Sequence, residues 1–318
     1  MTTKLNVAVL MGGPSAEAEV SRVSAREVAQ AVQAGDHKAT LIELDANTAP
    51  ALLELRPDVV FPALHGPPGE DGTVQGFLEI LGVCYVGSGV HASAVGMDKA
   101  LAKAAFRRAQ LPVLEDMLID ASRPADALAA EILATLGASV VIKPLAQGSA
   151  IGVTRVPGSS DLTAALATAI EEQPTESMFL VEPFVAAKEI TVGVIDLHGV
   201  EPAAFPVIEV TTAADEWYDY TNRYTAGKSE HIIPARLDPA LNEELQSIAV
   251  AAHRALGCRD LSRADFLVTD EGAISLLEVN TLPGMTPTSL YPDGAQATGM
   301  DFTTLVDELL RSAHRRGR

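Results

Sequence analysis

Short apolar strands alternate with amphipathic helices through the first 90 residues, and this order constrains the fold more than any other feature of the sequence. An apolar run from Asn6 breaks at Gly12-Gly13, and a helical pattern with valines on one side follows it. Strands that alternate with helices in this way predict a parallel sheet covered on both faces. We expect strands at residues 6–10, 39–44, 58–64 and 83–86, and helices at 16–34 and 72–81.

The pattern changes near residue 93, where strands and helices begin to follow one another in a compact α+β order. We expect helices at 93–110, 125–136 and 160–172, and strands at 113–119, 139–143, 153–156 and 178–183. A Gly/Ser loop at residues 147–152 joins two of these strands.

The remaining chain again mixes strands with helices, around a polar stretch at residues 211–229. We expect strands at 188–195, 203–210, 264–269 and 273–279, and helices at 239–256 and 301–313. Three domains fit this order: an α/β domain at 1–92, followed by α+β domains at 93–185 and 186–318.

Charge and composition exclude several classes of partner. The 318 residues carry a formal charge of −19, which argues against nucleic acid and against attachment to anionic lipid, because both need a basic surface. The one basic run, at residues 315–318, is expected to solvate the chain end. No stretch reaches the length of a membrane span, the N-terminus is a poor signal peptide, and Cys84 and Cys258 lack metal-ligand spacing. We therefore expect a cytoplasmic protein whose two thiols are buried and reduced.

Two glycine-containing segments follow strands in the first domain. Gly12-Gly13-Pro14-Ser15 and the nearby Glu17 open a helix at the carboxyl edge of the sheet, where ligands gather. A tight turn capped by Ser15, with Glu17 complementing the helix dipole, explains the same residues. His65 ends a strand and enters a loop rich in glycine and proline, but no second histidine lies at zinc-ligand spacing.

A second pattern suits phosphate binding. Lys99 and the strand-ending Lys143 supply positive charge, and the glycine loop after Lys143 supplies backbone N–H groups. The sequence has no P-loop motif, and a simple β-hairpin turn is the alternative interpretation of the loop.

The most specific pattern joins two neighbouring strands near the C-terminus. Arg263 and Asp265 lie on one strand, and Glu278 and Asn280 end the next. Antiparallel pairing would bring Asp265, Glu278 and Asn280 together as hard oxygen ligands, which suit Mg²⁺ or Mn²⁺. Arg263 beside them has a planar guanidinium that can donate two hydrogen bonds to a phosphoryl group or a developing oxyanion, although a structural ion pair is the simpler alternative.

Taken together, these motifs resemble the ATP-grasp superfamily and, within it, the D-alanine–D-alanine ligase family. The resemblance extends over nearly the whole chain. It rests on Gly12-Gly13-x-Ser15-x-Glu17-x-Glu19-Val20-Ser21, His65-Gly66-x-x-Gly69-Glu70-Asp71-Gly72-x-x-Gln75-Gly76, Tyr85-Val86-Gly87-Ser88-Gly89, Met97-Asp98-Lys99, Lys143-Pro144, Tyr218-Asp219-Tyr220 and Glu278-x-Asn280-Thr281-x-Pro283-Gly284-Met285-Thr286.

The resemblance implies an ATP-grasp fold in which an N-terminal parallel-sheet domain is followed by two α+β domains that clamp ATP. It implies a homodimer that uses ATP and two Mg²⁺ or Mn²⁺ ions to make D-alanyl-D-alanine, a peptidoglycan precursor, through a D-alanyl phosphate. The ATP-binding residues it implies are Lys99, Lys143, Glu182, Phe184, Val185, Glu189 and Arg223, and the metal-binding residues are Asp265, Glu278 and Asn280.

The resemblance also assigns the amino acid sites. Glu17 would hold the ammonium of the first D-alanine near His65, while Arg263 and the Gly284 N–H would stabilise the tetrahedral intermediate. Ser289 and the Leu290 N–H would take the carboxylate of the second D-alanine. The residues Ser149, Glu189 and Tyr224 match a hydrogen-bonded trio that closes a loop over the site.

Two positions depart from the family pattern. Ala150 stands where the family often has a second serine, and Arg223 stands where a lysine is usual. The first change removes one hydroxyl contact to phosphate, and the second keeps the charge with a different geometry.

Four alternatives compete with dipeptide synthesis. They are a sister ligase that makes D-alanyl-D-lactate, an ATP-grasp ligase for another amino acid, a nucleotide-binding protein without catalysis, and a dinucleotide-dependent dehydrogenase. Tyr224 favours an amine acceptor, and the metal-ligand set argues against a protein without catalysis. The missing G-x-G-x-x-G motif argues against a dehydrogenase.

Overall fold

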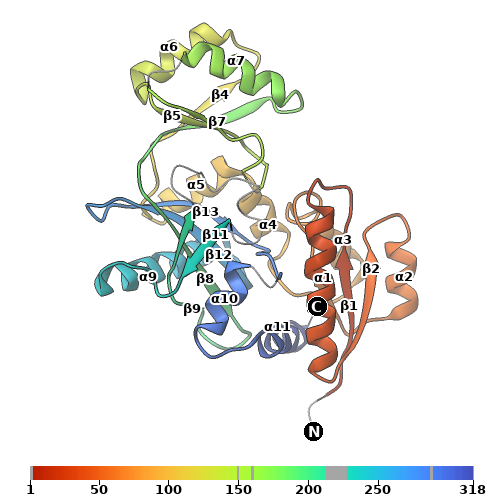
Figure 1. The fold of residues 1–318 in the computed structure, drawn as a ribbon. Helices are drawn as coiled ribbons and strands as arrows, with labels where there is room; N and C mark the ends of the chain where they lie inside the picture. The colour runs from red at the N-terminus through yellow and green to blue at the C-terminus, as the bar shows by residue number, and fades with distance from the viewer. Residues whose placement is uncertain (1–2, 149, 159–160, 213–227, 287–288, 318) are drawn as a thin grey trace.

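The computed structural model describes residues 3–148, 150–158, 161–212, 228–286 and 289–317, and these form three sheets (Figure 1). The N-terminal sheet has the strand order β2-β1-β3, the central sheet β4-β7-β5-β6, and the largest sheet β11-β10-β8-β12-β13 with β9 paired to β8. In the part of the chain described, no helix is both long enough and apolar enough to cross a membrane. Cys84 and Cys258 are both free thiols, as predicted, but only Cys258 is buried, since Cys84 is partly exposed.

The N-terminal sheet is parallel and covered on both faces, as predicted. Alternate residues of β1 point to opposite sides: Val7 and Val9 pack with α1 and α11, and Ala8 and Leu10 pack with α2 and α3. The strands are β1 Asn6–Met11, β2 Lys38–Glu43 and β3 Val59–Pro62, and the helices are α1 Ala18–Ala34, α2 Thr48–Leu55, α3 Thr73–Leu81 and α11 Phe302–Arg316.

Two expectations for this region are wrong. Residues 83–86 form no strand, because only Tyr85 pairs with the sheet, through an isolated bridge to Val60. Helix α2 was not expected, since its eight residues follow β2 without a strong amphipathic pattern.

The single helix expected at 93–110 is two helices, α4 Val90–Met97 and α5 Lys99–Arg108. Asp98 separates them in an extended conformation, and its carboxylate accepts hydrogen bonds from the Ala100 and Leu101 N–H groups at 2.9 Å each. Aspartate favours such a cap because its side chain satisfies N–H groups that have no partner in the helix. The break places Lys99 at the first residue of α5.

The central sheet is antiparallel, and two helices pack on one of its faces (Figure 1). Leu128, Ile132 and Leu166 from these helices bury against Ile142 of the sheet. The strands are β4 Met117–Asp120, β5 Val140–Pro144, β6 Thr154–Val156 and β7 Met178–Pro183, and the helices are α6 Ala125–Thr135 and α7 Leu162–Glu172.

The largest sheet pairs β8 with β12 and β12 with β13, and α9 covers it. One strand expected at 203–210 is two short strands, since Pro206 has no N–H to donate to a ladder. Strand β11 begins where the polar stretch was expected to end. The elements are β8 Lys188–Asp196, β9 Ala203–Ala204, β10 Ile208–Thr212, β11 Ser229–Ile232, α9 Pro239–Leu256, β12 Asp260–Val268, β13 Ile274–Asn280 and α10 Leu290–Gln296.

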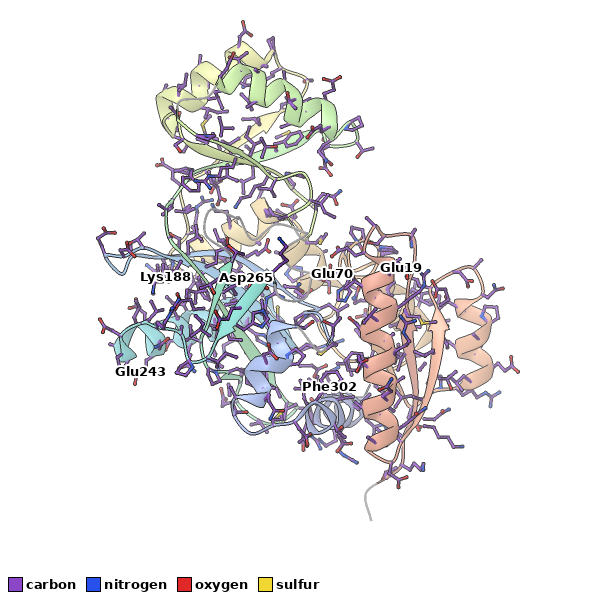
Figure 2. All side chains as sticks on the ribbon, viewed as in Figure 1. Glu19, Glu70, Lys188, Glu243, Asp265 and Phe302 are labelled. Atoms are coloured by element: carbon purple, nitrogen blue, oxygen red, sulfur yellow. The ribbon has the colours of Figure 1, made fainter. Side chains whose placement is uncertain are left out.

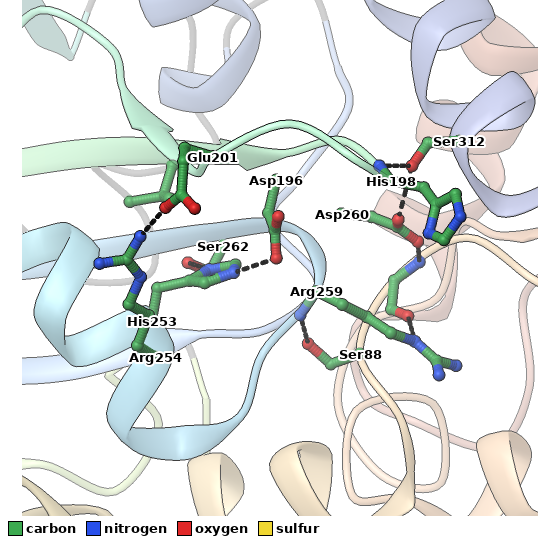
Figure 3. A network of polar contacts seen from close by, with 12 residues as sticks. Ser88, Asp196, His198, Glu201, His253, Arg254, Arg259, Asp260, Ser262 and Ser312 are labelled. Carbon is green, nitrogen blue, oxygen red and sulfur yellow. Dashed lines mark hydrogen bonds and ion pairs between the residues drawn. The ribbon is translucent and has the colours of Figure 1, made fainter. Parts of the chain in front are cut away.

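A polar network holds the start of β12 to the loop before α4 (Figure 3). The fully buried Asp260 accepts hydrogen bonds from the Gly87 N–H at 2.8 Å and from the Ser312 hydroxyl at 3.1 Å. Arg316 forms an ion pair with Asp260 and donates to the Tyr85 carbonyl at 2.8 Å. The expectation that the basic tail only solvates the chain end is therefore wrong for Arg316, which connects the C-terminal helix to Asp260 and Tyr85.

Candidate active site

Two adjoining pockets lie between the three sheets. The smaller is lined by Glu17, His65 and Glu70 from the N-terminal part and by Arg263 and Glu278 from the largest sheet. In Figure 2, Glu70 and Asp265 mark these two parts of the chain. The larger pocket lies between the central and largest sheets. The two pockets share Lys99, Gln147 and Glu278.

Glu17 and His65 lie together at the carboxyl edge of the parallel sheet, as predicted. Glu17 is the N-cap of α1 and is 4% exposed, and His65 follows β3 and is 6% exposed. The His65 Nε2 atom lies 3.1 Å from the Ser24 hydroxyl. Burial lowers the pKa of His65 and Arg263 lowers it further, against the opposing effect of Glu17. His65 is therefore neutral near pH 7.

Glu70 also belongs to the site, although its motif alone predicted no role for it. It is 9% exposed and accepts a hydrogen bond from the Gly66 N–H at 2.7 Å. Burial and the charge of Glu17 raise its pKa to about 8. A cation bound between the two carboxyl groups would relieve this repulsion and favour the charged form of Glu70. This end of the smaller pocket therefore suits an ammonium group.

Strands β12 and β13 bring the predicted metal-ligand set onto one face. Asp265 pairs directly with Glu278, and Arg263 pairs with Asn280. Arg263 donates to both carboxylate oxygens of Asp265, at 2.8 and 2.7 Å, and the Thr191 hydroxyl donates to the same carboxylate at 2.6 Å. Asp265 lines neither pocket, whereas the other three residues line the smaller one.

The donor chemistry of this face fits Mg²⁺ or Mn²⁺. Asp265, Glu278 and Asn280 offer carboxylate and amide oxygens, which hard cations prefer. Among the described residues, no three histidines, cysteines, aspartates or glutamates gather as a metal site, so the amide of Asn280 would have to complete the set. Asp265 would also have to exchange its contact with Arg263 for the cation, which frees the guanidinium for an anionic ligand.

The larger pocket gathers most of the residues assigned to the nucleotide. Lys143 forms an ion pair with Glu182, which is 2% exposed, and the Arg155 guanidinium lies 3.7 Å from the centre of the Phe184 ring. Burial alone would raise the pKa of Glu182, but Lys143 and Lys103 outweigh it and lower that pKa. The lining includes Lys99, Lys143, Glu182, Phe184, Val185 and Glu189.

The glycine loop reaches across both pockets. Gln147 lines each of them, and its carbonyl accepts a hydrogen bond from Lys99 Nζ at 2.7 Å. Lys99 Nζ also lies 3.8 Å from Glu278 Oε2. A Cβ on Gly148 would lie 3.4 Å from Glu17 Oε2, so the loop passes directly over the start of α1. Ser149, Arg223 and Tyr224 lie outside the described residues, so their assigned roles stay predictions.

Gly284, Ser289 and Leu290 line the smaller pocket, and a Cβ on Gly284 would lie 3.9 Å from His65 Cε1. Ser289 stands at the N-cap of α10, as predicted, but its side chain makes no cap hydrogen bond to the helix. Its hydroxyl instead accepts from the Thr286 N–H at 3.0 Å and lies 2.8 Å from the Thr286 hydroxyl. A Cβ on Gly284 would lie 2.9 Å from this hydroxyl, so glycine permits the close approach.

Comparisons with known proteins agree with this arrangement. The family model "D-ala D-ala ligase C-terminus" matches residues 105–311, and "D-ala D-ala ligase N-terminus" matches residues 49–88. The chain is 44% identical over 310 residues to the D-alanine–D-alanine ligase of Desulforudis audaxviator, covering 98% of this chain and 99% of that protein. It is 41% identical to the D-alanine–D-alanine ligase of Pelotomaculum thermopropionicum over 97% of this chain and 96% of that one.

Solved structures give the same result. The Bacillus anthracis D-alanine–D-alanine ligase complexed with ATP superposes with a TM-score of 0.82, at 29% identity over 98% of both chains. The Coxiella burnetii D-alanine–D-alanine ligase superposes with a TM-score of 0.81, at 26% identity, covering 98% of this chain and 96% of that one.

Proposed function

Because this chain belongs to the D-alanine–D-alanine ligase family, whose ATP-grasp fold it has, we propose that it uses ATP to join two D-alanine molecules into D-alanyl-D-alanine, a precursor of peptidoglycan. One observation carries this proposal. An amino acid pocket and a nucleotide pocket meet at Lys99 and Glu278, so a phosphoryl group can pass from one ligand to the other without leaving the protein.

The residues of the two pockets have separate roles in binding the substrates. Glu17 holds the ammonium of the first D-alanine near His65, and this directs its carboxylate toward Lys99 and Arg263. Lys99 and Lys143 neutralise the phosphates of ATP, Glu182, Phe184 and Val185 hold the adenosine end, and Glu189 binds ATP in the same pocket. Asp265, Glu278 and Asn280 would hold Mg²⁺ or Mn²⁺, which supplies Lewis acidity to phosphate oxygens when bound.

The reaction proceeds in two displacements. A carboxylate oxygen of the first D-alanine attacks the γ-phosphorus and ADP leaves, which gives an acyl phosphate. The amine of the second D-alanine, held through its carboxylate by Ser289 and the Leu290 N–H, then attacks the carbonyl carbon. Phosphate leaves, and it accepts the proton that the new amide nitrogen gives up. Arg263 and the Gly284 N–H stabilise the oxyanion of the tetrahedral intermediate, which exists after the amine attacks and before phosphate leaves.

Closure of a loop protects the acyl phosphate from water. The approach of Gly148 to Glu17 supports a role for the glycine loop as part of this cover. We assign the closing hydrogen bonds to Ser149, Glu189 and Tyr224, with Arg223 beside the phosphates. We further propose domains at 1–92, 93–185 and 186–318, a homodimer, and a place in the cytoplasm, where ATP is available.

The test is ATP-dependent phosphate release with a panel of D- and L-amino acids and D-lactate, with the product mass measured. D-alanine alone should support release and yield the mass of D-alanyl-D-alanine. Phosphate release that requires D-lactate as well as D-alanine would instead identify a depsipeptide ligase. Phosphate release with a different amino acid, and none with D-alanine, would identify that amino acid as the substrate.

A matched pair of variants ties this activity to the site. Glu278→Gln should abolish turnover, because it removes a carboxylate shared by both pockets. Glu271→Gln makes the same change on the exposed turn of the same hairpin and should leave turnover unchanged. Equal activity of the two variants would contradict the assignment of Glu278.

A further inference from the structure

We propose that Lys103, a buried lysine outside the family motifs quoted above, is a positioning residue for ATP: it holds Glu182 so that the Lys143 ammonium stays available to the nucleotide phosphates. This inference rests on the proposed function, because it concerns the nucleotide pocket of that same reaction. Lys103 is 1% exposed and lines neither pocket, so any effect it has on ATP must pass through a neighbour.

That neighbour is a carboxylate shared by two lysines. Lys103 forms an ion pair with Glu182 Oε1, and Lys143 forms one with Glu182 Oε2. A second carboxylate, Asp116, lies 3.0 Å from Lys103 Nζ and also pairs with Arg107. Lys103 therefore bridges two carboxylates, of which Glu182 lines the nucleotide pocket and Asp116 does not.

Helix α5 delivers two ammonium groups to the site from one face. Lys99 and Lys103 are four residues apart, a spacing that places side chains on the same side of a helix. Lys99 Nζ reaches the Gln147 carbonyl at 2.7 Å, while Lys103 reaches Glu182 on β7. Ala102 and Phe106 of the same helix pack into the core of the largest sheet. The Lys103–Glu182 contact thus fixes the central sheet to the largest sheet, between which ATP binds.

The charge balance explains why a lysine is needed here. With Lys103 in place, one Glu182 carboxylate faces two ammonium groups, so the charge of Lys143 is only partly compensated. Without Lys103, Glu182 would have Lys143 as its single cationic partner among the contacts described. Lys143 would then be held on Glu182 as a closed ion pair, and its attraction for phosphate would fall.

A purely structural role would not require this chemistry. Burying an ammonium costs free energy that an apolar side chain of similar length would not incur, and apolar replacements of buried ion pairs are often well tolerated. Arg107, one turn further along α5, pairs with the same Asp116 but has a side chain 46% exposed. It provides a matched cation that touches the cluster without contacting Glu182.

The experiment compares Lys103→Met, Lys103→Arg and Arg107→Met in the full-length chain by equilibrium titration with ATP. The KM values for ATP and D-alanine and the thermal unfolding midpoint are measured in parallel. We expect Lys103→Met to weaken ATP binding by about tenfold or more, the loss expected when a buried charge pair is broken, with KM for D-alanine changed by less than about twofold. Lys103→Arg should recover part of the ATP affinity, and Arg107→Met should bind ATP like the unmodified chain.

A double-variant cycle with Glu182→Gln separates positioning from folding. Because Lys103 acts through Glu182, adding Lys103→Met to Glu182→Gln should weaken ATP binding no further, and this pair leaves no unpaired Glu182 charge if the single variant fails to fold. The proposal is overturned if Lys103→Met lowers only the unfolding midpoint, if it weakens ATP equally in both backgrounds, or if Arg107→Met has the same effect. An unmodified chain that binds ATP but releases no phosphate with D-alanine would refute the proposed function, and the ATP affinities would still decide the role of Lys103.

Discussion

Gly66→Ala should damage the amino acid pocket through a single added methyl group. Gly66 has φ of +66°, a left-handed conformation that residues with a Cβ adopt only at a cost. A Cβ at this position would lie 2.5 Å from the Ser15 hydroxyl and 3.1 Å from Glu17 Oε2. Both of these atoms belong to the segment that holds Glu17 at the start of α1.

The magnitude has two parts. The left-handed backbone costs about 1–2 kcal/mol for a residue with a Cβ. The Ser15 hydroxyl must also move, and it would lose the hydrogen bond that it accepts from the Glu17 N–H at 3.1 Å, worth about 1 kcal/mol. We therefore expect a loss of about 2–3 kcal/mol in the free energy of unfolding and a displaced Glu17 carboxylate.

The control is Gly137→Ala, because Gly137 has φ of +87° and an added Cβ would meet nothing within 4 Å. It should cost only the backbone part, about 1–2 kcal/mol, and leave catalysis intact. Urea unfolding measures the first quantity, and the KM for D-alanine measures the second. We expect Gly66→Ala to raise this KM by about tenfold, equivalent to about 1.4 kcal/mol. If the two variants have equal stability and equal KM, the reasoning about Glu17 is wrong.

Three further predictions concern the buried Glu70, the helix cap Asp98 and the ion-paired Arg316. Glu70→Gln should stabilise the protein increasingly as pH rises from about 4.5 to about 8, by up to about 1.4 kcal/mol per pH unit. Because the pKa of Glu70 is raised in the folded state, the unmodified protein loses free energy of unfolding as pH rises through that window. If urea unfolding at pH 5.5, 6.5 and 7.5 gives the same difference in free energy between the variant and the unmodified protein, the raised pKa is wrong. Asp98→Ala removes the cap of α5, so it should lower the free energy of unfolding by about 1 kcal/mol and raise the KM for ATP. Asp161→Ala removes an equivalent cap of α7 and should change stability alone. Equal KM values for ATP in the two variants would contradict the role of the Asp98 cap in placing Lys99. Arg316→Met should lower the free energy of unfolding by about 3 kcal/mol, because it removes the cationic partner of the buried Asp260. A comparable loss from Arg315→Met, at an exposed position, would show that the basic tail acts only through its net charge.

Strongly patterned elements were predicted well from the sequence. Strand β7 and helix α9 begin and end at the expected residues, 178–183 and 239–256. The meeting of Asp265 and Glu278 also followed from local information, since strands joined by a short turn pair in antiparallel register.

Features that depend on distant partners escaped prediction. The apolar pattern continues through residues 93–110, so it did not reveal that Asp98 ends one helix and caps the next. Lys103 resembles any solvated helical lysine until Glu182, 79 residues away, is folded against it. Glu70 acquires its raised pKa only from burial beside Glu17, and no local pattern reports that burial.

The most direct test of the central claim follows the carboxylate oxygens of the first D-alanine. The reaction is run with ATP and D-alanine labelled with ¹⁸O at both carboxylate oxygens, and the phosphate released is analysed by mass spectrometry. Because the attacking carboxylate oxygen stays on phosphorus when the amine displaces phosphate, we predict one ¹⁸O in each phosphate and one in the new peptide carbonyl. Phosphate without label would show that ATP is cleaved by water instead, and it would contradict a D-alanyl phosphate intermediate.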